Sequence, residues 1–200
     1  MKLEIASDVI CPWCYIGKRR LEKALGLLKN EVTPQISWLP FQLNPGMPKE
    51  GMPRAEYRKA KFGSLERSRQ LDARVIAEGR SEGIEFAFER IERTPNTVAA
   101  HKLIQTAQQT GLGDLVKDAL FRAYFEEARD IGDPAVLADL AARCGVKGWP
   151  ENAPDLAALE DEVRAMGITA VPTFIFDRRS GISGAYPAET LAAAIREASK

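Results

Sequence analysis

Residues 8–22 of the 200-residue chain read DVICPWCYIGKRRLE, and the segment LEIAS precedes them at positions 3–7. Apolar and polar residues alternate in that segment, a pattern that predicts a β-strand. From position 12 to about position 28, apolar residues recur at helical spacing, which predicts a helix. The two cysteines of the quoted stretch, Cys11 and Cys14, therefore stand where a strand passes into a helix.

A second strand is predicted after this helix. Asn30 and Pro34 are typical of a helix end, and residues 35–41, QISWLPF, are rich in the aromatic and β-branched residues that favour strands. A strand, a helix and a strand in close succession form a βαβ unit. Its two strands are parallel and its connection is right-handed by default.

The middle of the chain is predicted to be helical, after a linker rich in proline and glycine at residues 44–53. Thr94–Pro95 and Asp133–Pro134 each place a proline at a first helical position, directly after a capping residue. Gly145 stands where a glycine would end a helix. The predicted helices span about residues 53–80, 95–110, 113–128, 133–143 and 154–166.

Beyond Gly167 the pattern returns to strands. Residues 173–176 (TFIF) predict a strand, 177–180 a turn, 181–183 a short strand and 187–197 a closing helix. The order of elements is therefore βαβ, a block of helices and ββα, an α/β arrangement.

Composition excludes several classes of function. Hydrophobic residues make up 45% of the chain, and 28 basic residues balance 28 acidic ones. Neither nucleic acid nor a membrane surface is therefore an expected partner, and no apolar run is long enough to predict a transmembrane helix. Glu4 and Asp8 interrupt the stretch that would be apolar in a signal peptide, so we expect a cytoplasmic location. One histidine and no second CxxC pair argue against a metal site.

The spacing of the two cysteines predicts redox chemistry. With Cys11 at the N-cap of the first helix, Pro12 takes the first helical position, Trp13 the second and Cys14 the third. The free N–H groups and the dipole of that helix would favour a Cys11 thiolate, which makes this residue the attacking group. Cys14 could then resolve a mixed disulfide. The alternative is a pair of ordinary reduced cysteines at a helix start.

Two neighbouring residues are expected to shift the pKa of the Cys11 thiol. Trp13 should desolvate the sulfur and oppose its ionisation, and no histidine stands between the cysteines, so we expect a modest lowering of the Cys11 pKa. Asp8 would raise that pKa or shuttle a proton. Alternatively, Asp8 caps a turn in the loop between strand and helix.

The second half of the site is predicted at residues 167–176, GITAVPTFIF, where Pro172 stands just before a strand. A cis bond there would turn the N–H and C=O of Val171 toward an extended peptide. A trans proline at the start of a strand is the alternative.

With CPWC early and VPTF late, the chain resembles the DsbA-like branch of the thioredoxin superfamily, in particular its cytosolic, FrnE-like subfamily. The segments that carry this resemblance are DVICPWCYIGKRRLE, PFQLNP, RTPNTVAAHKLI, YFEEARDIGD, GITAVPTFIFD and SGAYPAE. It implies a thioredoxin-like fold made of residues 1–45 plus 168–200, with a helical subdomain, residues 46–167, inserted between the two halves.

The resemblance also implies roles for residues. Cys11 matches the nucleophile, Cys14 the resolving cysteine, Pro172 the cis-proline and Val171 the residue before it. We expect Val171 and Pro172 to hold the substrate, with Pro12 and Trp13 shaping the surface beside the sulfur.

The same branch contains glutathione-dependent transferases and isomerases, in which a serine usually stands at the position of Cys11. By resemblance to them, Asn96, Ser183 and Gly184 are candidates for a glutathione or peptide site. The alternative is that Asn96 belongs to the first turn of a helix and Ser183 and Gly184 to a loop.

Other notable residues are given structural interpretations. His101 shares an apolar helix face and is expected to be buried and hydrogen-bonded, and Cys144 is expected to be a buried, inert thiol. The basic residues of the segment 53–80, Arg54 and Arg58 among them, are expected to form a solvated face.

Three functions remain open. The first is a disulfide oxidoreductase (oxidase, reductase or isomerase) acting on protein or peptide thiols. It would need no cofactor beyond its own Cys11–Cys14 disulfide, glutathione would be a candidate co-substrate, and a homodimer would be compatible with it. The second is a glutathione-dependent isomerase or transferase on a small molecule. The third is a binding module or chaperone that uses the helical subdomain as a groove.

Overall fold

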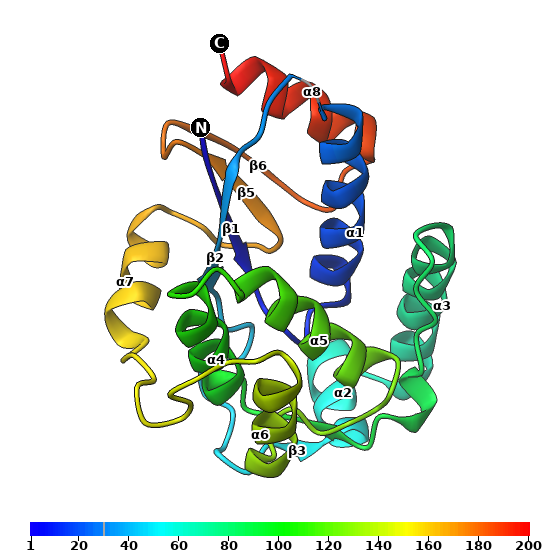
Figure 1. Ribbon diagram of the computed structural model, residues 1–200. Helices are drawn as coiled ribbons and strands as arrows, with labels where there is room; N and C mark the ends of the chain where they lie inside the picture. Colours follow the sequence, from blue (N-terminus) through cyan, green and yellow to red (C-terminus); the bar gives the residue numbers. More distant parts are fainter. Residues whose placement is uncertain (30) are drawn as a thin grey trace.

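The central sheet is built from the two ends of the chain (Figure 1). The computed structural model describes residues 1–29 and 31–200, and Asn30, predicted to mark a helix end, lies outside them. The sheet has the order β2-β1-β5-β6. Its strands are β1 (Lys2–Ser7), β2 (Gln35–Pro40), β5 (Thr173–Phe176) and β6 (Ser180–Ser183). The pairing of β1 with β2 is parallel, as predicted, whereas β5 runs antiparallel to both β1 and β6.

Helices cover both faces of the sheet. Helix α1 (Pro12–Leu27) connects β1 to β2 and packs against α8 (Ala188–Ala198) on one face (Figure 1). The strands send Leu3, Ile5 and Phe174 into this buried core. On the other face, α7 (Ala157–Ala165) packs against β2 through a smaller apolar cluster. That cluster consists of Ala6, Leu39, Val163 and Ile175.

The remaining helices follow β2 in the chain and precede β5, so the predicted fold is confirmed: a thioredoxin-like α/β fold with helices inserted between its halves. Helices α4 and α5 pack against each other and also contact β2. The boundaries at residues 45 and 168 stay predictions. The inserted helices are α2 (Arg54–Phe62), α3 (Leu65–Ser81), α4 (Val98–Gln108), α5 (Gly113–Phe125), α6 (Pro134–Arg143) and α7.

The prediction of one helix over residues 53–80 is wrong. The chain breaks at Gly63, whose φ of +84° lies in the left-handed region that glycine adopts at little cost. Ser64 then starts α3, because its side chain accepts a hydrogen bond of 3.1 Å from the N–H of Arg67. The insertion therefore contains two helices here, α2 and α3.

The predicted helix start at Thr94–Pro95 is also wrong. Thr94 belongs to a short strand, β4 (Arg93–Thr94), that pairs with β3 (Met52–Pro53), and a 3₁₀ turn (Phe88–Arg90) precedes it. The helix signals at Asp133 and Gly145 are confirmed. Asp133 caps α6 with a hydrogen bond of 2.8 Å from the N–H of Ala135, and Gly145 follows that helix with a φ of +72°.

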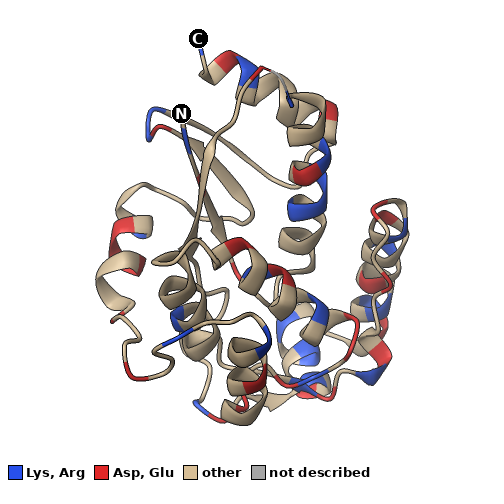
Figure 2. Ribbon diagram, viewed as in Figure 1, with Lys and Arg blue, Asp and Glu red and all other residues tan. Residues whose placement is uncertain are grey.

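Charge is spread over the outer helices. Basic and acidic residues alternate along α3 and mix elsewhere (Figure 2), as the balanced composition leads one to expect. Among residues 1–29 and 31–200, no helix combines the length and apolarity that crossing a bilayer requires.

Candidate active site

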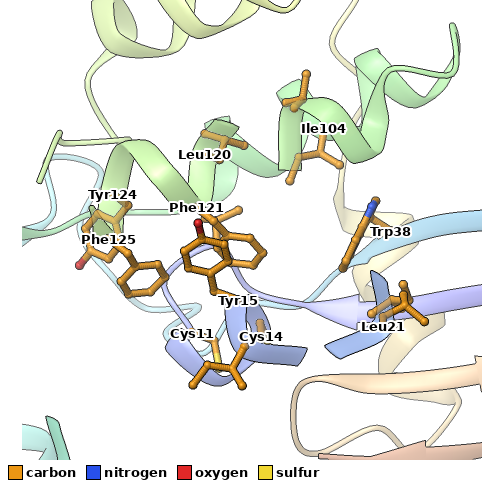
Figure 3. Packing of buried hydrophobic residues seen from close by; sticks show 14 of the residues in the cluster. Cys11, Cys14, Tyr15, Leu21, Trp38, Ile104, Leu120, Phe121, Tyr124 and Phe125 are labelled. Carbon is orange, nitrogen blue, oxygen red and sulfur yellow. The ribbon is translucent and has the colours of Figure 1, made fainter. Parts of the chain in front are cut away.

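The two cysteines lie side by side at the start of α1 (Figure 3). Cys11 is the N-cap, with extended backbone, and Pro12 occupies the first turn. The N–H of Cys11 donates to the carbonyl of Asp8 at 3.2 Å, which closes the turn between β1 and the helix. Both sulfurs are reduced, and the residues are only 5% and 1% exposed. Cys11 is thus the slightly more exposed residue of a buried pair.

A second segment meets Cys11 from 160 positions away in the chain. The bond between Val171 and Pro172 is cis, and the Cys11 thiol donates to the carbonyl of Val171 at 3.8 Å. The carbonyl of Pro172 accepts a hydrogen bond of 2.8 Å from the N–H of Gly184, just past β6. Helix α1 can approach this segment because position 17 is glycine: a Cβ atom on Gly17 would lie 2.9 Å from Cγ of Pro172.

The three candidate residues for a glutathione or peptide site lie in two different parts of the structure. Ser183 and Gly184 lie at the end of β6, where the Ser183 hydroxyl accepts from Thr173 at 2.9 Å. Asn96 stands before α4, and its amide is used within the chain: it donates to the carbonyl of Met47 at 2.7 Å and accepts from the N–H of Val98 at 3.0 Å. Asn96 thus precedes the N-cap Thr97 and is not part of the first turn of α4, and its role at a ligand site stays a prediction.

The two thiols titrate as a pair. The hydrogen bond with Cys14, together with burial, holds the pKa of Cys11 well above its usual value. Burial also acts to raise the pKa of Cys14, but the hydrogen bond from Cys11 and the charge of Lys117 outweigh it and lower that pKa. The expected lowering at Cys11 is absent here, because burial and the neighbouring thiol oppose the helix N-terminus.

Buried polar side chains lie behind the pair. Asp8 is fully buried, and its carboxylate accepts from the N–H of Leu43 at 2.8 Å and contacts Nε2 of His101 at 3.1 Å. His101 is therefore buried and hydrogen-bonded, as predicted. The side chain of Asp8 holds the segment after β2 and α4 in place, whereas only its backbone carbonyl closes the turn before Cys11.

Lys117 of α5 is the residue that sequence reasoning missed. It is 1% exposed and lies over the rings of Trp38 and Phe121. Its position four residues before Phe121, on the apolar face of its helix, was a usable signal, because a lysine on such a face is rarely solvated.

Two further expectations concern residues away from the pair. Cys144 is a buried thiol at the end of α6, where burial raises its pKa, as expected of an inert cysteine. The solvated face predicted for the basic residues of 53–80 is wrong for Arg54 and Arg58. Both are mostly buried and pair with Asp72. Among the described residues, no cluster of three potential metal ligands exists.

Three comparisons place this geometry among known proteins. The family described as DSBA-like thioredoxin domain matches residues 2–196. The crystal structure of the probable DsbA oxidoreductase SCO1869 from Streptomyces coelicolor is similar, with a TM-score of 0.89 and 32% identity over 99% of this chain and 89% of that chain. The cytosolic disulfide reductase DsbM from Pseudomonas aeruginosa, solved with GSH, shares the fold with a TM-score of 0.66 and 18% identity over 99% and 95% of the two chains. The uncharacterized protein YwbO of Bacillus subtilis (strain 168) is 28% identical over 182 residues, which are 86% of this chain and 85% of YwbO.

Proposed function

Because this chain belongs to the family of DSBA-like thioredoxin domains, a family of thiol–disulfide oxidoreductases, we propose that it exchanges disulfides with protein or peptide thiols through Cys11 and Cys14. One observation carries the proposal: the Cys11 sulfur lies between the first turn of α1 and the carbonyl of Val171, with Cys14 beside it on the same helix. That arrangement offers a nucleophile, a resolving thiol and a backbone edge for a substrate.

In the reducing direction, the Cys11 thiolate attacks a substrate disulfide. The substrate S–S bond breaks, one substrate sulfur leaves as a thiolate and the other stays in a mixed disulfide with Cys11. Cys14, as thiolate, then attacks the Cys11 sulfur, releases the second substrate sulfur and leaves the Cys11–Cys14 disulfide. The oxidising direction is the reverse. Val171 and Pro172 hold the substrate backbone beside the sulfur, and Pro12 and Trp13 border it.

The proposal includes no resident cofactor beyond this disulfide. We propose glutathione as the co-substrate that resets the pair, and a cytoplasmic location. Both are supported by the name of DsbM, a cytosolic disulfide reductase solved with GSH. In this scheme, Ser183 and Gly184 at the end of β6 would border the bound peptide or glutathione.

The test compares three cysteine variants in exchange with a disulfide-bonded peptide, with glutathione present. Cys11→Ser should abolish exchange, because it removes the attacking sulfur. Cys14→Ser should accumulate a mixed disulfide on Cys11, visible by mass spectrometry. Cys144→Ser is the matched control, since this buried thiol lies at the end of α6, and it should exchange like the wild type.

Other results would point elsewhere. Normal turnover by Cys14→Ser with tight glutathione binding would contradict the dithiol scheme and favour glutathione-dependent chemistry on Cys11 alone. A chaperone would be favoured if the wild type exchanged no disulfides and the double cysteine variant still suppressed the aggregation of unfolded proteins.

A further inference from the structure

A small cavity that the exchange scheme does not use lies next to the cysteine pair. Ile10 and Pro12, which flank Cys11 in the sequence, form part of its wall. Arg54 and Arg58 of α2 form another part, so we call it the arginine cavity. Its volume is about 30 Å³, which is room for one or two groups the size of water. The lining thus brings two arginines to the residues on either side of the reactive cysteine.

A larger groove along α3 adjoins the arginine cavity. Its volume is about 750 Å³, which is ample for a segment of a ligand. The residues that line both spaces are Arg54, Arg58, Phe88 and Ile91. The groove also carries charges of both signs, from Arg69, Asp72, Glu89 and Glu92. Among the described residues that line the arginine cavity, by contrast, only the two arginines are charged, so the end nearest the cysteines is the more positive one.

The two guanidinium groups share one carboxylate. Asp72 of α3 accepts from Arg54 at 3.3 Å and also pairs with Arg58. All three side chains are only 13–15% exposed. Two positive charges against one negative charge leave an excess of one positive charge in a mostly buried place. Such a charge is unfavourable away from water unless an anion compensates for it.

Arg54 is the guanidinium with donors to spare. Arg58 also donates to the hydroxyl of Ser68 at 2.6 Å and to its carbonyl at 3.1 Å. In the part of the chain that the structure describes, the side chain of Arg54 makes a single hydrogen bond, the one to Asp72. A guanidinium has five N–H donors in a planar fork that fits a carboxylate. The remaining donors of Arg54 therefore suit a carboxylate bound in the arginine cavity.

We propose that Arg54, supported by Arg58, binds a carboxylate of the substrate, so that the enzyme prefers protein segments with an acidic residue close to the reactive cysteine. The inference rests on the proposed function and deepens it. The main chain at Val171 holds a peptide of any sequence, and the arginine cavity adds a preference. The acidic residue lies within about two positions of the substrate cysteine, because the cavity begins one residue from Cys11 and neighbouring Cα atoms are about 3.8 Å apart.

Two peptide disulfides provide the test, each a disulfide-linked pair of identical short peptides. In the acidic peptide an aspartate stands on either side of the cysteine, and in the neutral peptide an asparagine replaces each aspartate. The reduced protein is mixed with either one, and formation of the Cys11–Cys14 disulfide is followed by alkylation and mass spectrometry. Each rate is divided by the rate of the same peptide with uncharged dithiothreitol. At low salt the wild type should favour the acidic peptide about fivefold or more, and sodium chloride should weaken this preference by screening.

Arg54→Gln removes the charge and keeps a polar side chain, while Arg58 still pairs with Asp72. The variant should react about tenfold more slowly with the acidic peptide and less than about twofold more slowly with the neutral one. Arg54→Lys keeps the charge without the planar fork and should recover part of the loss. Arg74→Gln is the matched control, because Arg74 is an exposed residue of α3 outside both linings, and it should keep the wild-type preference.

Several results would overturn the proposal. They are a wild type without preference for the acidic peptide, equal losses with both peptides in Arg54→Gln, and the same change in Arg74→Gln. The first needs no variant, so it decides the matter even if Arg54→Gln does not fold. Slower reduction of the oxidised Arg54→Gln protein by glutathione, with the acidic peptide unaffected, would mean that the cavity holds the carboxylate of a small thiol instead.

Failure of this inference and failure of the proposed function give different results. If the wild type exchanges disulfides with both peptides at equal rates, only the preference is wrong. If it exchanges with neither peptide, the proposed function itself fails and this inference with it.

Discussion

Two sets of neighbours surround the cysteine pair, and they differ in kind. Toward β5 and β6, Cys11 meets the main-chain carbonyl of Val171, and the carbonyl of the next residue, Pro172, accepts from the N–H of Gly184. The second set consists of buried side chains, namely Ser7, Asp8, His101 and Lys117. Main-chain groups suit a site that accepts peptides of many sequences, whereas buried charges act on the sulfurs without contacting a substrate. Changes in the two sets should therefore affect different properties.

The largest effect is expected from Asp8→Ala. The variant leaves the N–H of Leu43 and the ring of His101 without their buried partner. Each buried group left unsatisfied costs about 1–3 kcal/mol, so the loss of both partners should lower the free energy of unfolding by about 2–6 kcal/mol. Urea denaturation monitored by tryptophan fluorescence measures this loss.

Asp133→Ala is the control for Asp8→Ala. Asp133 also accepts a backbone N–H, from Ala135, but it does so at an exposed helix start. Loss of such a cap costs about 1 kcal/mol. Equal losses of unfolding free energy in the two variants would show that the buried Asp8–His101 contact contributes no more than an ordinary helix cap. The buried side chains would then not differ from exposed ones in their effect on stability.

A smaller effect, confined to the main-chain side, is expected from Gly17→Ala. The new Cβ would lie 2.9 Å from Cγ of Pro172, which is too close, so the segment of Val171 and Pro172 must shift away from α1. Overpacking of this kind costs about 1–3 kcal/mol. Because the shift also moves the carbonyl of Val171 from Cys11, the exchange rate should fall about tenfold, a change of about 1.4 kcal/mol.

The same helix supplies the control for Gly17→Ala. Gly26 is exposed, and a Cβ there meets nothing within 4 Å. Gly26→Ala should therefore raise the free energy of unfolding by about 0.5–1 kcal/mol, since alanine is the better helix former, and leave exchange unchanged. Unchanged exchange in Gly17→Ala would mean that the contact of α1 with Pro172 does not position the site.

The contrast between main-chain contacts and buried side chains also explains which parts of the site could be predicted from the sequence. The strands, α1 and the location of Cys11 at its N-cap follow from short-range patterns: alternation, helical spacing and a proline after the cap. The break at Gly63 was missed because the residues on both sides favour a helix, and a single glycine decides the backbone there. Local rules therefore predict the frame of the site, including the position of each cysteine.

The buried charges could not be predicted in this way. The contact of His101 with Asp8 joins residues 93 positions apart, and Lys117 of α5 lies over the ring of Trp38, far away in the sequence. Helical spacing alone places both residues on apolar faces and says nothing of what lies opposite. The packing of the inserted helices on β2 and α1 decides which groups face these two side chains. It also decides which buried groups surround the thiols, and so the direction in which each thiol pKa moves.

The smallest effect is expected from Ser183→Ala, again on the main-chain side. The Ser183 hydroxyl accepts from Thr173 at an exposed position, so its loss should change stability by less than about 0.5 kcal/mol. If the substrate is held by backbone groups, the exchange rate with a peptide disulfide should also stay within about twofold, as it should for the exposed Ser180→Ala on the same strand. A tenfold loss in Ser183→Ala alone would mean that this hydroxyl contacts the substrate. The main-chain side would then recognise a specific ligand, such as glutathione, rather than peptides in general.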